Sequence, residues 1–233
     1  MIQLNEYVKG IYTDEKGTVL PYRLYDPKLG SGRPLLVFLH GAGERGTDNE
    51  VTLSKPVAPF AEECALDLED YGAYLLAPQC ACDHQWVDKP WGKGSYDQSS
   101  IPISKHLAAA KSLIDEIVEK YDIDKNRIYI MGCSMGGFGT WDMITRFPGY
   151  FRAALPICGG ADPKMAEKIK DMPIWTFHGD ADDAVPVQGT REMVEALRAV
   201  NGDIIYSEYK GCGHGVWKHV HSAKCVYDWL FSR

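Results

Sequence analysis

Short apolar runs alternate with longer amphipathic stretches along this chain of 233 residues. Residues 34–40 (PLLVFLH) are almost continuously apolar, which predicts a strand buried on both faces of a sheet. In residues 103–121, apolar side chains recur at steps of three and four, which predicts a helix with one apolar stripe. By the same criteria we expect further strands at 2–12, 18–26, 73–78, 127–131, 153–157, 173–178 and 203–209, and further helices at 135–147, 187–199 and 218–232.

This alternation of strands and helices is typical of a mostly parallel sheet that helices cover on both faces. The first two strands differ, because the short turn around residues 14–17 favours an antiparallel pair. No stretch of the chain resembles a linker, an internal repeat or a low-complexity tract. The sequence therefore predicts a single α/β domain over residues 1–233.

One segment, residues 80–102, has no hydrophobic period and contains Trp86, Trp91 and Tyr96 among polar residues, Gly and Pro. An irregular segment of this length inside a compact domain is usually functional, so we interpret it as an active-site loop. Trp86, Trp91 and the more distant Trp217 are candidates for the wall of a substrate pocket. The alternative is that these large aromatic side chains simply anchor their loops.

Composition and charge exclude several classes of protein. Hydrophobic residues make up 45% of the chain and charged residues 24%, which excludes intrinsic disorder. The net charge is −7 and basic residues do not cluster along the sequence, which argues against a nucleic-acid partner. No run of eighteen apolar residues occurs, so we expect no transmembrane helix and no membrane partner.

The cysteines and the first residues bear on the compartment. Seven irregularly spaced cysteines argue against a disulfide framework and favour a reducing compartment. The first six residues, MIQLNE, do not resemble a secretory signal. We therefore expect a cytoplasmic protein, or a secreted or periplasmic one if a leader has been removed ahead of Met1. The oligomeric state stays open, and a homo-oligomer is compatible with the sequence.

The segment GCSMG at residues 132–136 matches the pattern G-x-S-x-G and lies between a predicted strand and a predicted helix. In that context the serine, Ser134, is held on a sharp turn with its hydroxyl exposed above the sheet. A glycine-rich turn with an incidental serine is the simpler interpretation, and the strand–turn–helix context favours the nucleophile. Phosphate binding is disfavoured, because the run lacks the G-K-[ST] of a phosphate loop.

Two later loops supply candidates for a base and for the acid that orients it. His214 follows the strand predicted at 203–209, and Asp180, Asp182 and Asp183 follow the strand predicted at 173–178. Open α/β sheets form their sites at the carboxyl ends of such strands, and the order serine, acid, histidine is typical of hydrolases. The pattern alone does not separate the three acids, which also suit Asx turns.

The loop HGAGERG, residues 40–46, follows the strand predicted at 34–40. An oxyanion hole on this kind of sheet combines the N–H of the residue after the nucleophile, here Met135, with an N–H from this loop. Ala42 and Gly43 are the two candidates for the donor from this loop, the first oxyanion donor, and Met135 supplies the second. A flexible turn with no role in catalysis is the alternative.

Four motifs in order, HGAGERG, GCSMGG, HGDADDAVP and GCGHGVW, together resemble the α/β-hydrolase superfamily. The resemblance spans nearly the whole chain. It is closest to the phospholipase/carboxylesterase and dienelactone-hydrolase-like esterases, including feruloyl-esterase-like proteins and predicted peptidases. It implies the α/β-hydrolase fold, with a central, mostly parallel sheet of about eight strands flanked by helices. It also implies that Asp182 is the catalytic acid, from the pattern HG-x-x-D-x-x-V-P, and that Ala42 is the first oxyanion donor.

The residues and the resemblance together predict a serine carboxylesterase that acts through an acyl-enzyme, with Ser134, His214 and Asp182 as its triad. We expect small ester substrates, including aromatic or carbohydrate-linked acetyl and feruloyl esters. Thioester or small-peptide hydrolysis stays open, as does a ligand receptor on a hydrolase scaffold. This chemistry requires no cofactor or metal. The segment CACDH at 80–84 lacks the second ligand pair of a zinc site.

Overall fold

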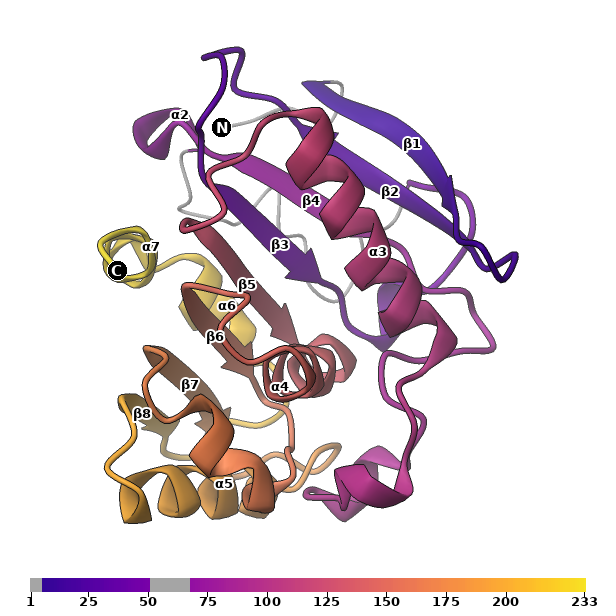
Figure 1. Cartoon of the computed structure of the whole chain (residues 1–233). Helices are drawn as coiled ribbons and strands as arrows, with labels where there is room; N and C mark the ends of the chain where they lie inside the picture. The colour runs from indigo at the N-terminus through magenta and orange to yellow at the C-terminus, as the bar shows by residue number, and fades with distance from the viewer. Residues whose placement is uncertain (1–5, 51–67) are drawn as a thin grey trace.

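An eight-stranded sheet forms the centre of the computed structural model, which describes residues 6–50 and 68–233 (Figure 1). The strands lie in the order β1-β2-β4-β3-β5-β6-β7-β8. Their bounds are β1 Tyr7–Thr13, β2 Val19–Tyr25, β3 Leu35–Leu39, β4 Tyr74–Pro78, β5 Ile128–Cys133, β6 Ala153–Ile157, β7 Ile174–Gly179 and β8 Ile204–Tyr209. The predicted strands are thus confirmed within the described residues, whereas residues 2–5 of the first one lie outside them.

The sheet is antiparallel at one edge and parallel elsewhere. β1 pairs with β2 and β2 with β4 in antiparallel fashion, and from β4 to β8 all pairs are parallel. All five residues of β3 and all six of β5 are buried, as expected of central parallel strands covered on both faces. The prediction of a mostly parallel sheet that starts with an antiparallel pair is confirmed.

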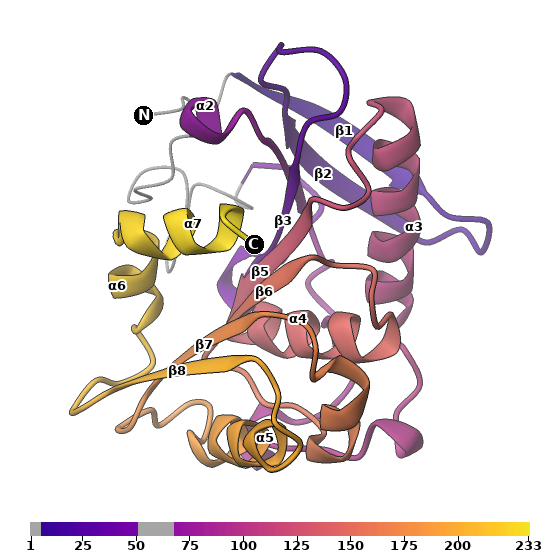
Figure 2. The same ribbon diagram turned by 60° about the vertical axis from the view of Figure 1, so that its left-hand side comes forward.

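Helices cover the two faces of this sheet. Figure 2 shows α3, α4 and α5 on one side of the sheet, with α2, α6 and α7 on the other. Successive side chains of β3 point to opposite faces, so Val37 packs in the cluster that contains α3 and α4, and Phe38 in the cluster that contains α7. The bounds are α2 Leu68–Tyr71, α3 Lys105–Lys120, α4 Met135–Arg146, α5 Gln188–Ala199, α6 Trp217–His221 and α7 Lys224–Phe231.

The last predicted helix, 218–232, is wrong as a single element, because α6 and α7 are separate. Ala223 between them has an extended backbone, with φ −96° and ψ 99°. Ser222 also donates its hydroxyl to the carbonyl of Lys218, a local bond that competes with helix continuation. The break lets both short helices bury side chains, among them Val220 and Tyr227.

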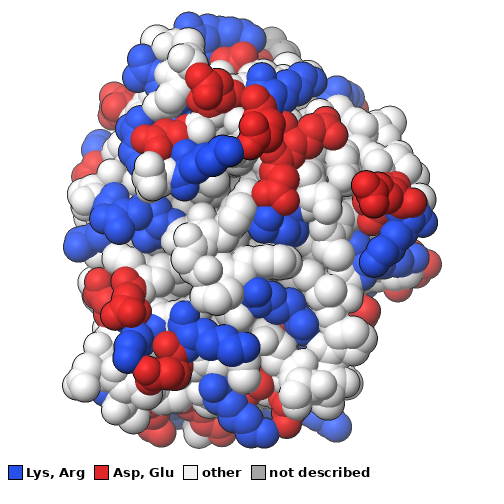
Figure 3. Space-filling model, viewed as in Figure 1, with Lys and Arg blue, Asp and Glu red and all other residues white. Residues whose placement is uncertain are grey.

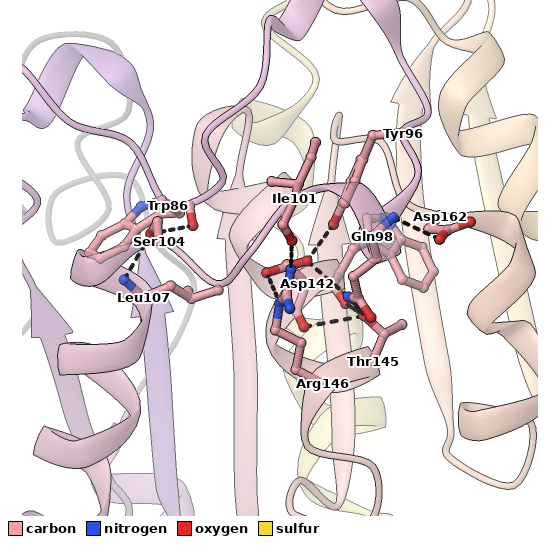
Figure 4. A network of polar contacts seen from close by, with 11 residues as sticks. Trp86, Tyr96, Gln98, Ile101, Ser104, Leu107, Asp142, Thr145, Arg146 and Asp162 are labelled. Carbon is pink, nitrogen blue, oxygen red and sulfur yellow. Dashed lines mark hydrogen bonds and ion pairs between the residues drawn. The ribbon is translucent and has the colours of Figure 1, made fainter.

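The loop 80–102 contains only two short 3-10 turns, Trp91–Lys93 and Gln98–Ser100, as regular structure. Figure 4 shows how buried polar groups fix it to α4. Asp142 accepts hydrogen bonds from the Tyr96 hydroxyl at 2.8 Å and the Gln98 amide at 2.9 Å, and its second oxygen lies 2.6 Å from Arg146 Nε. The loop is therefore an anchored part of the structure, although it has no hydrophobic period.

The outer surface carries both signs of charge. On the face shown in Figure 3, Lys and Arg side chains are interspersed with Asp and Glu. Mixed charges of this kind do not form the single basic surface that phosphate-backbone binding uses. Within the described residues, no helix combines the length and the apolar character needed to span a membrane.

Replacing Asp142 tests the anchoring of the loop. Asp142→Ala removes the acceptor of three buried or half-buried donors, so we expect the free energy of unfolding to fall by about 3 kcal/mol. Urea unfolding followed by fluorescence measures the change. Glu119→Ala removes an exposed partner of Lys125 and should change stability by less than about 1 kcal/mol. Equal losses in both variants would contradict the role of the Asp142 network.

Candidate active site

Ser134 lies at the sharp turn between β5 and α4, with φ 56° and ψ −117°. A positive φ is unfavourable for a residue with a Cβ, and it persists only where neighbouring structure enforces it. Here the backbone N–H of Ser134 donates to the carbonyl of Ile157 on β6 at 2.9 Å. The strained residue of this segment is thus the one that the sequence predicts as the nucleophile.

The glycines around Ser134 make this turn sterically feasible. A Cβ on Gly136 would lie 1.8 Å from the carbonyl oxygen of Leu39 at the end of β3. A Cβ on Gly132 would lie 2.5 Å from the carbonyl oxygen of Gly136. Both distances are far below van der Waals contact, so the first turn of α4 approaches β3 and β5 only because these positions are glycine.

Three side chains from different loops form a continuous hydrogen-bonded series at this edge of the sheet. Ser134 Oγ lies 2.8 Å from Nε2 of His214, and Nδ1 of His214 lies 2.7 Å from Oδ2 of Asp182. Asp180 instead accepts a hydrogen bond from the N–H of Gly211, and Asp183 is exposed. Of the three acids on the loop, the structure brings Asp182 to His214.

The carboxylate of Asp182 is fully buried and surrounded by donors. One oxygen accepts from the N–H groups of Ala184 at 3.0 Å and Val185 at 2.9 Å, and the other lies 3.2 Å from Nε2 of His178. Burial alone raises the pKa of Asp182, but the hydrogen bonds from His178, His214 and Val185 hold this pKa well below its usual range. An ionised Asp182 fixes the proton of neutral His214 on Nδ1, so Nε2 can accept the Ser134 proton.

The two backbone N–H groups expected to form an oxyanion hole belong to residues at the start of helical segments. Ala42 begins a short 3-10 turn, Ala42–Glu44, and Met135 is the first residue of α4. Within residues 6–50 and 68–233, neither N–H group donates to a protein acceptor. An incoming substrate oxygen therefore meets no competing protein acceptor for these donors.

A small cavity opens at Ser134. Its volume is about 140 Å³, and its wall consists of Gly41, Ala42, Gly43, Glu44, Cys133, Ser134, His214 and Trp217. The Trp217 ring meets the His214 ring edge-on, with centroids 5.0 Å apart. Trp217, one of the three candidates for the wall of a substrate pocket, thus lines this cavity next to His214.

The other two tryptophans lie elsewhere. Trp86 is fully buried in the core and donates its Nε1–H to the carbonyl of His40 at 3.1 Å, so the prediction that it walls a pocket is wrong. Its large ring fills the space beside α4, where Gly139 leaves room for it. Trp91 lines a separate hollow of about 340 Å³ with residues 85 and 88–90 and does not line the cavity at Ser134.

Sequence reasoning missed three side chains near the site. Glu44 lies buried in the cavity wall, although the motif HGAGERG suggested only backbone donors. His178 contacts the backbone carbonyl of Val185 and also Asp182, a pairing that the four-residue spacing in HG-x-x-D could have suggested. Cys158 is fully buried behind Asp182, and burial raises its thiol pKa well above the usual value.

Two further histidines, His106 and His221, are buried. His106 packs against the ring of His84 with centroids 4.5 Å apart, and His221 lies edge-on to Phe38 at 5.9 Å. Burial lowers the pKa of both, to about 4 and about 3 respectively, so they are neutral near pH 7. Neither lines the cavity at Ser134.

Comparison with known proteins shows the family to which the chain belongs. The family model described as phospholipase/carboxylesterase matches residues 28–222. The chain belongs to the phospholipase/carboxylesterase family. The members of this family are serine hydrolases of the carboxylesterase type, and the fold is that of the α/β-hydrolases.

Two proteins named as esterases are similar to this chain, and a more distant peptidase shares its fold. A bifunctional acetylxylan esterase/xylanase of Neocallimastix patriciarum is 34% identical over 189 residues, which are 80% of this chain and 25% of that protein. A thermostable esterase of known crystal structure is 36% identical, with a TM-score of 0.87, over 98% of this chain and 63% of that one. The acylaminoacyl peptidase of Pyrococcus horikoshii, at 15% identity and TM-score 0.69 over 99% of this chain and 42% of that one, shares the fold. The chain spans less than half the length of the curated relatives it matches.

Gly136→Ala tests whether the close approach of α4 to β3 sets the position of Ser134. The new methyl group must displace the helix from the carbonyl of Leu39, so we expect esterase activity to fall by about 10²-fold or more. Initial rates on p-nitrophenyl acetate measure the loss, with circular dichroism as a check of folding. The control is Gly92→Ala, where no atom lies within 4 Å of the added methyl group. A fully active Gly136→Ala protein would refute this steric account.

Proposed function

We propose that the chain is a serine carboxylesterase that hydrolyses esters of short acyl groups, acetyl esters above all. The observation that carries this proposal is the series Ser134–His214–Asp182, which opens onto a cavity of about 140 Å³. The series supplies a nucleophile and its base, and the small cavity limits the group that fits beside them. Membership of the carboxylesterase family supports the same reaction.

In the proposed reaction, Ser134 Oγ attacks the ester carbonyl while Nε2 of His214 takes the hydroxyl proton. Asp182 holds the ring in the required tautomer and stabilises the imidazolium that forms. The N–H groups of Ala42 and Met135 stabilise the oxyanion. The imidazolium returns its proton to the leaving alcohol, and water then attacks the acyl-enzyme by the same route in reverse.

The size of the cavity favours a short acyl group. A volume of about 140 Å³ corresponds to roughly five water-sized groups. An acetyl group has three non-hydrogen atoms and fits this space, whereas a feruloyl group is several times larger. Acetylated carbohydrate is the substrate class we favour, because the Neocallimastix patriciarum relative at 34% identity is named as an acetylxylan esterase/xylanase.

Replacing each member of the series tests the proposed roles. On p-nitrophenyl acetate, Ser134→Ala is expected to lower kcat by about 10⁶-fold, because the nucleophile is lost. Asp182→Asn is expected to lower kcat by about 10⁴-fold, because the amide stabilises the wrong tautomer of His214. Asp180→Asn and Asp183→Asn are matched controls on the same loop and should change kcat only slightly. A 10⁴-fold loss in either control would show that the acid is misassigned.

The substrate profile tests the proposed acyl group. We expect kcat/KM to be at least tenfold higher for p-nitrophenyl acetate than for the octanoate, with methyl cinnamate slower still, and acetate to be released from acetylated xylan. A preference for octanoate would refute the short-acyl proposal and leave the serine esterase intact. If the wild-type protein hydrolyses no ester faster than Ser134→Ala does, the esterase proposal fails. Acyl thioesters and small peptides then become the substrates to test.

A further inference from the structure

The buried thiol of Cys158 lies beside the proposed acid and base. Its Sγ, a carboxylate oxygen of Asp182 and a ring nitrogen of His214 all lie within 4.8 Å of one another. Cys158 and the Asp182 side chain are fully buried, whereas the His214 side chain is 24% exposed. In the part of the chain that the structure describes, no other group of three such ligand atoms is found.

The sheet fixes Cys158 in this position. Cys158 follows β6, which pairs with β5, the strand before Ser134, and with β7, the strand before Asp182. Its backbone N–H donates to the carbonyl of Phe177 on β7 at 2.8 Å. The thiol is therefore placed by the strands that precede Ser134 and Asp182.

Sulfur, imidazole nitrogen and carboxylate oxygen are together a ligand set for Zn²⁺. In a tetrahedral zinc site with bond lengths of about 2.0–2.3 Å, such donors lie about 3.4–3.6 Å apart. The three atoms, at most 4.8 Å apart, reach that spacing through shifts of about 1 Å, and the 2.7 Å bond between His214 and Asp182 opens by a similar amount. The fourth position is left for water.

We propose that Cys158, Asp182 and His214 form a binding site for a soft divalent cation, Zn²⁺ or its analogue Cd²⁺, and that occupation of this site switches off hydrolysis. The inhibitory effect rests on the proposed roles of Ser134, His214 and Asp182, whereas the binding itself does not. Of the three side chains, His214 lines the cavity at Ser134 and is the one that solvent reaches.

The proton balance explains the inhibition. Without metal, Nδ1–H of His214 donates to Asp182, and Nε2 accepts the proton of Ser134. When the ion binds through Nδ1, the ring carries its single proton on Nε2, which then has no lone pair for the Ser134 proton. Cys158 binds as a thiolate and releases one proton to solvent. No atom changes its oxidation state, and the bound form has no general base.

Titration of esterase activity with zinc is the first arm of the test. We expect zinc to inhibit hydrolysis of p-nitrophenyl acetate, EDTA to restore the rate, and Cys158→Ser to raise the half-inhibiting zinc concentration at least tenfold. Cys212→Ser is the matched control, because Cys212 is half-buried two residues before His214 but lies outside the group. Both variants should keep their rate in the absence of metal. Equal inhibition of wild type and Cys158→Ser would overturn the proposal.

Cadmium binding is the second arm and needs no activity. The ultraviolet charge-transfer absorbance of a cadmium–thiolate bond is measured in Ser134→Ala, with the exposed Cys82 and Cys225 replaced by Ser in every protein compared. We expect the absorbance in Ser134→Ala and its loss when Cys158→Ser is added. If the absorbance depends on Cys158 but the wild-type protein hydrolyses no ester, the metal site is supported and the esterase proposal fails. The same absorbance with and without Cys158 would overturn the metal site.

Discussion

The close approach between the first turn of α4 and the end of β3 is the constraint on which the site depends. A Cβ on Gly136 would lie 1.8 Å from the carbonyl oxygen of Leu39, so backbone meets backbone at this point with no side chain between them. This approach turns the chain sharply at Ser134 and brings α4 next to the loop that starts at His40. Nucleophile and candidate oxyanion donors thus take their positions from one steric contact.

The loop 80–102 supports this arrangement from behind. His40 starts the loop 40–46, which carries the proposed oxyanion donor Ala42. It donates Nδ1–H to the carbonyl of Gly41 and accepts the N–H of Cys80 at Nε2. Its carbonyl accepts from the Trp86 ring, so both ends of this residue are tied to the loop. Burial lowers the pKa of His40 to about 4, which keeps this bonding pattern neutral and unchanged near pH 7. Trp86, which the sequence suggested for the wall of a substrate pocket, thus fixes the start of the loop 40–46 instead.

Much of the fold was predictable from the pattern of apolar residues alone. The strands β3 and β5 are buried along their whole length and α3 buries one apolar stripe, so the local pattern agrees with the tertiary packing. The single helix at 218–232 was wrong, because a break at Ala223 that depends on packing leaves the apolar spacing almost intact. The choice of Asp182 over its neighbours needed the resemblance, since three acids on one loop differ only in how the turn directs them. The contact between His178 and Asp182 is local and could have been suggested by their four-residue spacing. The position of the Cys158 thiol comes from packing between strands far apart in sequence, which no local pattern records.

The order of the strands has a consequence for how the protein acquires its site. β3 pairs with β5, although β4, the loop 80–102 and α3 lie between them in the chain, and β8 at the far edge precedes His214. Parallel pairing across long sequence separations is slow, because the loop entropy is lost before the contacts form. In a chain emerging from the ribosome, the loop 40–46 is thus synthesised early and the proposed base, His214, is synthesised late. We expect the hydroxyl of Ser134 to gain its hydrogen-bond partner, His214, only when β8 pairs with β7. Docking of this edge strand therefore sets when the proposed site is complete in the nascent chain.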